Sequence, residues 1–239
     1  MMGRLPARAR LRLEDPMRTT VLISAALGAV IVSACAGSAT VGDRMFDHFS
    51  RAGQIQTALI MGDLDGARRP GSWLAEHESF EDLGSEARPW VEMIRSSARE
   101  VEEAPSIEEA ADATGRLASA CAGCHTASND GPRFRSAGDA PPANTRGAHM
   151  VGHLWAMDRM WEGLIGASDE TWRAGARAIA DIEPESGFPG GGTAAVLART
   201  VHDQAQEAER AEAQDRPAAY AEMMKTCASC HTLLGAGGA

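Results

Sequence analysis

The sequence predicts an all-α protein made of two tandem up-down-up-down four-helix bundles. Helical spacing of apolar residues runs through the chain after about residue 40, and no β-branched stretch bounded by turns competes with it. The chain also repeats itself, since His48 aligns with His153 at an offset of 105 residues and Cys121 aligns with Cys227 at an offset of 106. Short connections between successive helices favour antiparallel neighbours in each repeat.

In the first repeat, residues 41–126, the sequence contains N-terminal signals for the second, third and fourth helices. A first helix is predicted over 41–61, and Asp63 is a suitable N-cap for a second helix that reaches about residue 76. Pro89 occupies an early position of a third helix, as prolines commonly do. Ser106 followed by acidic residues forms a capping box that opens the fourth.

The second repeat, residues 148–234, follows a linker over residues 127–147 that is rich in Gly, Pro, Asn and Asp. Its first helix is predicted over 149–165, and Ser168 is expected to cap the second. Thr193 is expected to cap the third helix, and Pro217 lies near the start of the fourth.

Residues 1–35 are predicted to be an export signal with a lipid-bearing cysteine. Arg18 precedes an apolar run over 21–32, which at about 1.5 Å per residue is too short to cross a bilayer core of about 30 Å. Small residues then lead to Cys35, which resembles the lipobox of bacterial lipoproteins and implies a lipidated Cys35. The alternative is an ordinary signal peptide that is cleaved near Ala36 or Ala39.

The chain that would remain after export is strongly acidic. Residues 1–34 contain five arginines and two acidic residues, so the remainder has 18 basic and 31 acidic side chains and a formal net charge of −13. Such a surface disfavours nucleic acid and favours a protein partner with a basic docking face. The alternative is an acidic shell that serves only solubility.

Two cysteine pairs, each followed by a histidine, carry the clearest chemistry. In Cys-x-x-Cys-His, the thiols add to the haem vinyl groups and the histidine ligates the iron. A zinc site would instead gather both pairs at one ion, and a thioredoxin-like dithiol would need a βαβ setting. We therefore expect two covalently bound c-type haems, one per bundle, attached through Cys121, Cys124 and His125 and through Cys227, Cys230 and His231.

The position of these motifs resembles that in class II c-type cytochromes, the cytochrome c′ type. In that family, a four-helix bundle carries Cys-x-x-Cys-His near the end of its last helix. Here the motif closes each repeat, so the resemblance implies a tandem dihaem version of that bundle. The chain departs from the family at Asn129 and Gly235, where a basic residue often follows the ligand histidine.

Each repeat also contains a histidine that is placed to meet the second face of its haem. In an up-down-up-down bundle, the first helix begins where the fourth one finishes, so we expect His48 near His125 and His153 near His231. The corresponding separations are 77 and 78 residues. We predict that His48 and His153 are the sixth ligands of the two irons.

Met45 and Met150 are the competing ligands, because they repeat three residues earlier on the same helix face. A methionine at such a position is also ordinary core filler. The remaining alternative is an iron with an open sixth position.

Two closed irons would leave no coordination position for a substrate, so electron transfer rather than catalysis is the predicted function. The protein would act in the periplasm, held at a membrane by its lipid, and would exchange electrons with redox partner proteins. An open iron would instead favour a gas-binding or sensing protein of the cytochrome c′ type, or a dihaem peroxidase-like enzyme.

Overall fold

The computed structural model describes residues 40–77, 84–129, 131–134, 138–142, 146–182 and 191–236. The chain divides into two units, residues 1–44 and 45–239. The described part of the first unit is residues 40–44, where the Asp43 carboxylate accepts a hydrogen bond from the Thr40 hydroxyl at 2.8 Å. The predicted export signal and Cys35 lie outside the described residues, as do parts of the predicted linker.

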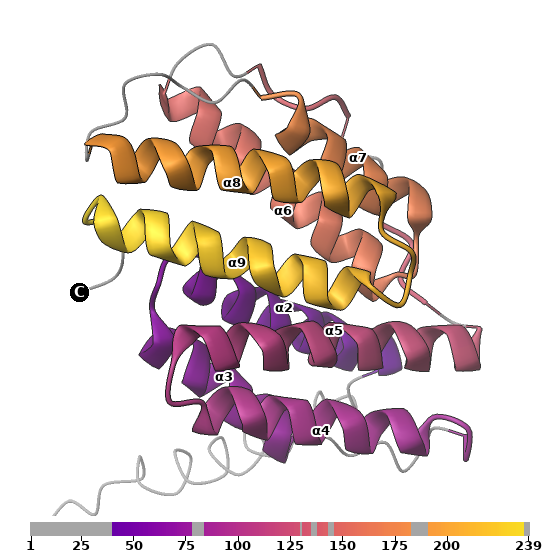
Figure 1. Ribbon diagram of the computed structural model, residues 1–239. Coiled ribbons are helices and arrows are strands. Elements are labelled where there is room, and N and C mark those ends of the chain that lie inside the picture. Colours follow the sequence, from indigo (N-terminus) through magenta and orange to yellow (C-terminus); the bar gives the residue numbers. More distant parts are fainter. Residues whose placement is uncertain are drawn as a thin grey trace, which may run out of the picture. The chain divides into compact units, whose positions relative to one another are not determined.

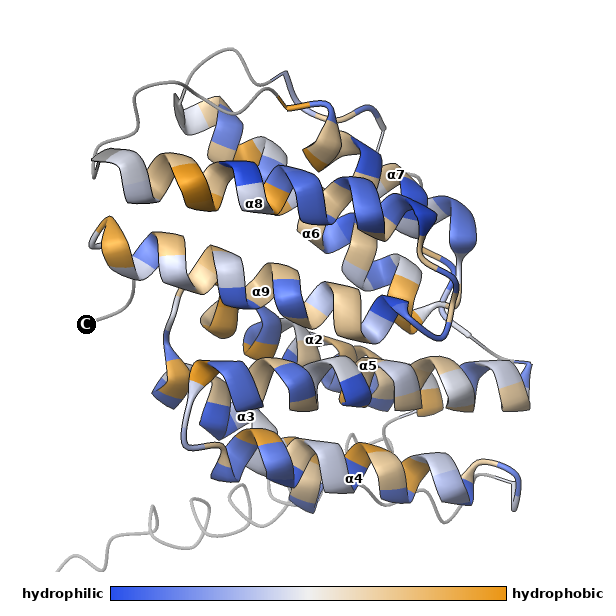
Figure 2. Cartoon of the chain, in the orientation of Figure 1, coloured by the Kyte–Doolittle hydropathy of each residue, from blue (hydrophilic) through white to orange (hydrophobic). Residues whose placement is uncertain are grey.

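The regular structure of the described residues is entirely α-helical, as the sequence predicts (Figure 1). Hydrophilic and hydrophobic residues share each helix, which is typical of helices with one buried face (Figure 2). None of the described helices combines the length and the apolar character needed to cross a membrane. The helices are α2 (Val41–Ile60), α3 (Leu64–Glu76), α4 (Arg88–Glu103), α5 (Ile107–Ser128), α6 (Arg146–Ile165), α7 (Asp169–Ala180), α8 (Gly191–Arg210) and α9 (Arg216–Leu233).

Three helices begin at the caps that the sequence predicts. Asp63 accepts a hydrogen bond from the Gly66 amide at 2.8 Å, and Ser106 and Ser168 accept from amides three residues later. The prediction for α8 was wrong: the helix begins at Gly191, so Thr193 lies inside its first turn rather than at its cap.

Each helix from α3 to α9 packs on the next one along the chain. Helix α4 contacts α3 and α5, while α7 contacts α6 and α8, and α8 contacts α9. The halves also meet, because α5 packs on α9 and on α6, and α9 lies between α8 and α5 (Figure 1). One buried apolar cluster includes Leu59 from the first half and Met160 from the second, so the described core is continuous across the repeat.

A buried tyrosine links three helices of this shared core. Tyr220 of α9 accepts a hydrogen bond from the Gln56 amide of α2 at 2.8 Å and donates one to the Met157 carbonyl of α6 at 3.1 Å. Its ring also stacks on Trp161, with centroids 5.6 Å apart. Both Tyr220 and Gln56 are almost fully buried. These hydrogen bonds therefore take the place of the bonds that the hydroxyl and the amide would make with water.

The two halves repeat one long-range contact with different side chains. The Arg68 guanidinium of α3 donates to the Ala104 carbonyl at 2.9 Å. The Trp172 indole of α7 donates to the Ala208 carbonyl at 2.7 Å, and both contacts span 36 residues. In each half, a side chain of the second helix (α3 or α7) therefore bonds a carbonyl at the C-terminal end of the third helix (α4 or α8).

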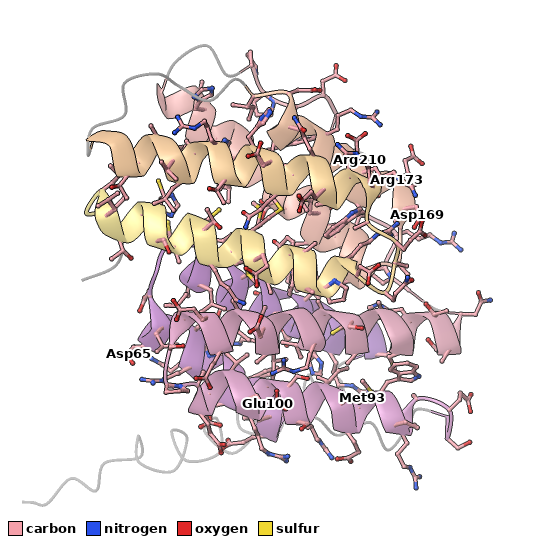
Figure 3. The ribbon with its side chains drawn as sticks, in the orientation of Figure 1. Asp65, Met93, Glu100, Asp169, Arg173 and Arg210 are labelled. Atoms are coloured by element: carbon pink, nitrogen blue, oxygen red, sulfur yellow. The ribbon has the colours of Figure 1, made fainter. Side chains whose placement is uncertain are left out.

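Glu100, Asp169 and Arg173, which Figure 3 labels, each take part in an exposed ion pair. Glu100 of α4 pairs with Arg116 of α5 at 2.5 Å. Asp169 of α7 pairs with Arg173 at 3.6 Å and with the buried Arg216 at 2.6 Å. Exposed pairs contribute little to stability, so the shared apolar core is the main source of cohesion.

Candidate haem sites

The two Cys-x-x-Cys-His segments lie in corresponding places, in the last turns of α5 and α9. Side chains three and four residues apart share one face of a helix. In α5, Cys121 therefore faces the same side as Cys124 and His125, and α9 repeats this arrangement. Each segment thus presents two thiols and one imidazole along a single helix face.

Each of the two histidines contacts the first helix of the other half. The Nδ1 atom of His125 lies 3.0 Å from the carbonyl oxygen of Ile165, the last residue of α6. The Nδ1 atom of His231 lies 2.7 Å from the carbonyl oxygen of Ile60, the last residue of α2. A histidine that donates through Nδ1–H keeps the lone pair of Nε2 for another partner.

Phe49 of α2 is connected through Phe134 to the end of α6 that contacts His125. Phe49, which follows the predicted ligand His48, packs on Phe134 with ring centroids 5.2 Å apart. Phe134 in turn lies against Gly166, whose added Cβ would be 3.1 Å from its ring. Gly166 directly follows the residue whose carbonyl holds His125. This chain of contacts links the residue after His48 to the helix end that holds His125.

The indole ring of Trp73 packs against His48. The ring of Trp73 meets His48 edge-on, with centroids 5.5 Å apart, and stacks on His77 at 4.8 Å. The Arg51 guanidinium lies 5.2 Å from the same indole ring. The pairing of Trp73 with His77 was missed from the sequence, although their spacing of four residues in one helix was an available signal.

A further indole packs on the backbone between the first two cysteines. Gly123, between Cys121 and Cys124, lies so close to the ring of Trp90 that any Cβ at this position would overlap it. The corresponding position in the second segment is Ser229, whose hydroxyl donates to the Lys225 carbonyl at 2.9 Å. The two segments therefore differ in the contact made by the residue before the second cysteine.

The second site contains two histidines on α6. The rings of His149 and His153 are 6.2 Å apart, and His149 is only 9 % exposed. Burial lowers the pKa of His153 to about 4, and the charges of His149 and His231 act in the same direction. The charge of His231 therefore acts on His153, which remains the predicted sixth ligand of the second site. The burial of His149 was missed because the first repeat has no counterpart of it.

The competing methionine of the second half faces solvent. Met150 is 36 % exposed, whereas His153, one turn later, is half-buried. In the first half, Met45 and His48 are both half-buried. Burial therefore favours His153 over Met150 as the sixth ligand of the second site. At the first site, burial does not distinguish His48 from Met45.

The thiols of the second segment are shielded from solvent. Burial raises the pKa of the Cys227 thiol to about 12, and the nearby Cys230 adds to this shift. Burial also raises the pKa of Cys230. Both groups are therefore kept protonated, which disfavours the reactions of an exposed thiolate.

The donor set is compatible with haem attachment at both segments. Within the described ranges, no three His, Cys, Asp or Glu side chains gather as a metal site, so the two cysteine pairs do not converge as a four-cysteine zinc site requires. Haem c needs only two thiols on one helix face and a histidine with a usable Nε2, and both segments offer these. Comparison with family models, with curated proteins and with solved structures finds no match to this chain.

Proposed function

We propose that the protein is an exported dihaem c-type cytochrome that transfers electrons, with one haem on the Cys121–His125 segment and one on the Cys227–His231 segment. The observation that supports it best is the pair of Nδ1 contacts to main-chain carbonyls. Metal-ligating histidines usually donate their second ring N–H in this way, which fixes the tautomer and the ring orientation. Here both motif histidines have that partner, at 3.0 and 2.7 Å.

In this proposal each motif histidine is oriented by a main-chain carbonyl from the other half of the chain. The Ile165 carbonyl orients His125, and the Ile60 carbonyl orients His231. His48 and His153 supply the sixth ligands. When bound, haem iron would accept and release one electron per site. Each half is then a cytochrome c′-like bundle, and the two form a tandem pair.

Electron transfer is favoured over gas binding by the burial of the second site. His153 is half-buried and near His231, while Met150 is exposed, so a histidine is the better-placed sixth ligand there. A closed iron has no position for a gas or a substrate. The acidic chain would attract a redox partner with a basic docking face.

Export and lipidation complete the proposal. A periplasmic location supplies the compartment in which c-type haem is attached, and a lipid on Cys35 would hold the protein at a membrane. Intact mass of the exported protein tests this point. A product that begins at Cys35 with acyl chains is expected, whereas a product that begins after Cys35 would contradict it.

The haem proposal is tested by expressing the chain with its export signal in a host that attaches c-type haem. We expect two haems per chain in the denatured, pyridine-treated protein. The pair Cys121→Ala and Cys124→Ala should remove one haem, and the pair Cys227→Ala and Cys230→Ala should remove the other. As a matched control, Cys35→Ala should keep both. A chain that is folded and exported but carries no covalent haem would refute the proposal.

A further inference from the structure

The two candidate haem sites lie at opposite ends of a helix pair. Helices α5 and α9 run side by side in opposite directions (Figure 1). A Cβ added to Gly115 of α5 would lie 3.7 Å from the Cβ of Ala221 of α9. Each motif histidine lies ten residues beyond this contact, His125 in α5 and His231 in α9. At about 1.5 Å per residue, the two histidines are therefore about 30 Å apart along the helices. An electron that passes directly from one site to the other must cross the protein between them.

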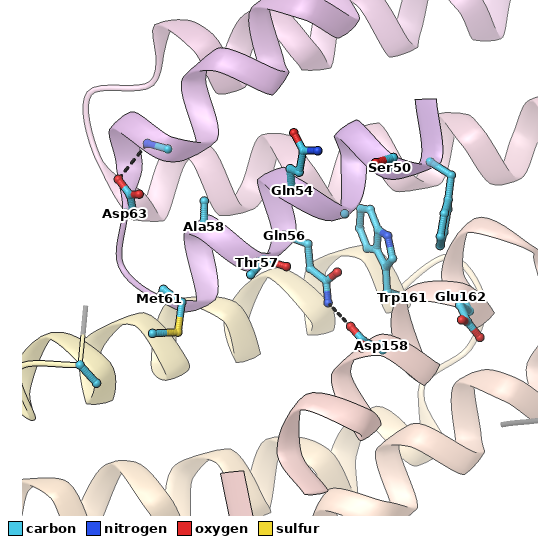
Figure 4. A pocket seen from close by; sticks show the side chains of 14 residues that line it. Ser50, Gln54, Gln56, Thr57, Ala58, Met61, Asp63, Asp158, Trp161 and Glu162 are labelled. Carbon is cyan, nitrogen blue, oxygen red and sulfur yellow. Dashed lines mark hydrogen bonds between the residues drawn. The ribbon is translucent and has the colours of Figure 1, made fainter. Parts of the chain in front are cut away.

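Tyr220 of α9 lies midway between the two sites, beside this contact with α5. Its ring stacks on Trp161 of α6 with centroids 5.6 Å apart, and its hydroxyl accepts from the Gln56 amide of α2 at 2.8 Å. Gln56 and Trp161 are equivalent positions of the sequence repeat, 105 residues apart. Both line one pocket, where the Gln56 amide also donates to Asp158 at 3.4 Å (Figure 4). Tyr220 therefore contacts the same position in the first helix of each half.

Trp161 connects Tyr220 to the first site. Ile165 follows Trp161 by four residues in α6, so the helix pairs the Ile165 amide with the Trp161 carbonyl. The carbonyl oxygen of Ile165 lies 3.0 Å from Nδ1 of His125. A stacked ring, one helical turn and one hydrogen bond therefore join Tyr220 to His125.

The second site is connected to Tyr220 twice. Ile60 follows Gln56 by four residues in α2, and its carbonyl oxygen lies 2.7 Å from Nδ1 of His231. Cys227 lies seven residues after Tyr220 on the same face of α9. The second site is therefore reached both through the Gln56 amide and along α9 itself.

This route does not require any side chain to be oxidised. Burial raises the pKa of the Tyr220 hydroxyl well above its ordinary value, so the group keeps its proton and donates a hydrogen bond to the Met157 carbonyl at 3.1 Å. An electron can instead tunnel: the iron of one site loses it, the iron of the other gains it, and no bond of the route forms or breaks. Tunnelling declines less steeply through covalent bonds, hydrogen bonds and stacked rings than across gaps between atoms.

We propose that the stacked pair of Tyr220 and Trp161 forms an electron route between the two haem sites. The inference rests on the proposed function, because it needs an iron at each end. The protein would then take up an electron at one end of the α5–α9 pair and release it at the other. Trp172 also contacts Tyr220, with centroids 6.2 Å apart, but its indole donates to the Ala208 carbonyl and so leads to α8 rather than to a motif histidine.

The route is tested by injecting one electron at a known end of the full, dihaem chain. Asp65 and Glu170 are exposed and occupy equivalent positions of the repeat. They lie five residues after Ile60 and Ile165, which hold the motif histidines. Asp65→Cys and Glu170→Cys can therefore each carry a thiol-linked ruthenium photosensitiser, next to the second and the first site respectively. A flash reduces the nearer haem, and absorbance then follows the electron to the other haem.

Transfer should be seen in the protein whose label lies at the site of lower potential, at a rate that does not depend on protein concentration. No transfer in either labelled protein would show isolated sites and would overturn the inference. Haem content is measured first. A chain without two haems refutes the proposed function, and the route with it, whereas a dihaem chain without transfer refutes the route alone.

Trp161→Met tests the assigned stack, because it replaces the ring by an apolar side chain without stranding a hydrogen-bond partner. The Nε1 donor of Trp161 has no partner within the part of the chain that the structure describes. Transfer should slow by about an order of magnitude, since the electron must cross the gap left by the ring. The reduction potentials and haem spectra should stay those of the wild type, because neither motif histidine is changed. Trp161→Phe puts a smaller ring at the same position and should slow the transfer less.

Trp172→Met is the matched control, because it makes the same change at the other buried indole that contacts Tyr220. Its transfer rate should equal that of the wild type. Equal slowing by Trp172→Met would show a general loss of packing and would overturn the assignment to Trp161. Wild-type rates in folded Trp161→Met and Trp161→Phe would refute it as well.

Discussion

The Nδ1 atom of His231 lies 2.7 Å from the carbonyl oxygen of Ile60, although the two residues are 171 positions apart in the chain. The reciprocal contact joins His125 to the Ile165 carbonyl at 3.0 Å. Since these isoleucines end α2 and α6, each motif histidine rests on the first helix of the other half. A substitution at the C-terminal end of α2 should therefore alter the site of His231, and one at the end of α6 should alter the site of His125.

Gly62 gives a direct way to disturb one of these contacts. It follows α2 in a left-handed conformation with φ of 76°, and a Cβ there would lie 2.7 Å from the Thr232 hydroxyl, beside His231. Gly62→Ala combines backbone strain with this close contact, so we expect a loss of about 1–2 kcal/mol in the free energy of unfolding. Urea denaturation measures the loss.

The absorption spectra of the two haems show which site the Gly62→Ala substitution alters. In Gly62→Ala, the haem held by His231 should change while the haem held by His125 does not. Gly53→Ala is the matched control within α2, because a Cβ at Gly53 meets no atom within 4 Å. That variant should be stabilised by up to about 1 kcal/mol through helix propensity. A change confined to the His125 site in Gly62→Ala would contradict the crossed arrangement.

The helices and several of their caps could be predicted because their signals are local. Ser106 and Ser168 each bond an amide three residues later, and this chemistry is written in a short stretch of sequence. The start of α8 could not be found in this way, because Gly191 and Gly192 offer no capping side chain. Thr193, the nearest residue with capping chemistry, was chosen in error.

The contacts between the halves could not be predicted from the sequence. Periodicity tells which face of a helix is apolar, but not which helix covers it. The bond from Gln56 to Tyr220 spans 164 residues, and the bond from His231 to Ile60 spans 171. The sequence repeat suggested that each half completes its own site, whereas the described structure has each half contributing to the other.

Tyr220→Phe tests the buried link between α2, α6 and α9. The change removes the hydroxyl that accepts from Gln56 and donates to the Met157 carbonyl. Since it leaves buried polar groups with fewer partners, we expect a loss of about 1–3 kcal/mol in the free energy of unfolding, measured in urea. Adding Gln56→Met to Tyr220→Phe should recover part of the loss, because the stranded amide is then gone. Fully additive losses would show that the two side chains do not interact.

Asp158→Asn should alter the pH dependence of stability. Burial raises the carboxyl pKa of Asp158, while the Gln56 hydrogen bond and the Arg159 charge oppose this. The folded state therefore binds a proton more strongly than the unfolded state, so this group lowers stability as pH rises above the ordinary carboxyl range near about 4. Asn cannot ionise, so the gain of the variant over wild type should develop as pH rises from about 4 to the raised pKa of Asp158 and stay constant above it.

Urea denaturation across this pH range measures the difference. Asp203→Asn, which removes an exposed carboxylate from α8, is the control for a simple change in net charge. The gain of Asp158→Asn should exceed that of the control and should grow with pH until it levels off above the raised pKa of Asp158. A gain that shrinks as pH rises would mean that the carboxylate is stabilised in the folded state, contrary to the direction given by its burial.

Ligation of the two irons decides between an electron carrier and a gas-binding protein. If His48 and His153 are the sixth ligands, both haems should be low-spin in the oxidised and reduced protein and should bind carbon monoxide slowly or not at all. His48→Ala should then create a high-spin, gas-binding iron at the first haem alone, and His153→Ala should do so at the second. His48→Ala also removes an edge contact with Trp73, which contributes about 0.5–1.5 kcal/mol, so stability is measured alongside the spectra.

The methionines provide the controls for this experiment. Met150→Leu changes an exposed side chain and should affect neither spectrum nor stability. Met45→Leu keeps apolar volume at a half-buried position and should cost less than about 1.5 kcal/mol, with the spectrum unchanged. If the methionine variants open the irons while the histidine variants stay low-spin, the ligands are Met45 and Met150 instead. If the unmodified protein already binds carbon monoxide at one haem, that iron has an open position, and a gas-binding or enzymatic function then accounts for the protein better than electron transfer.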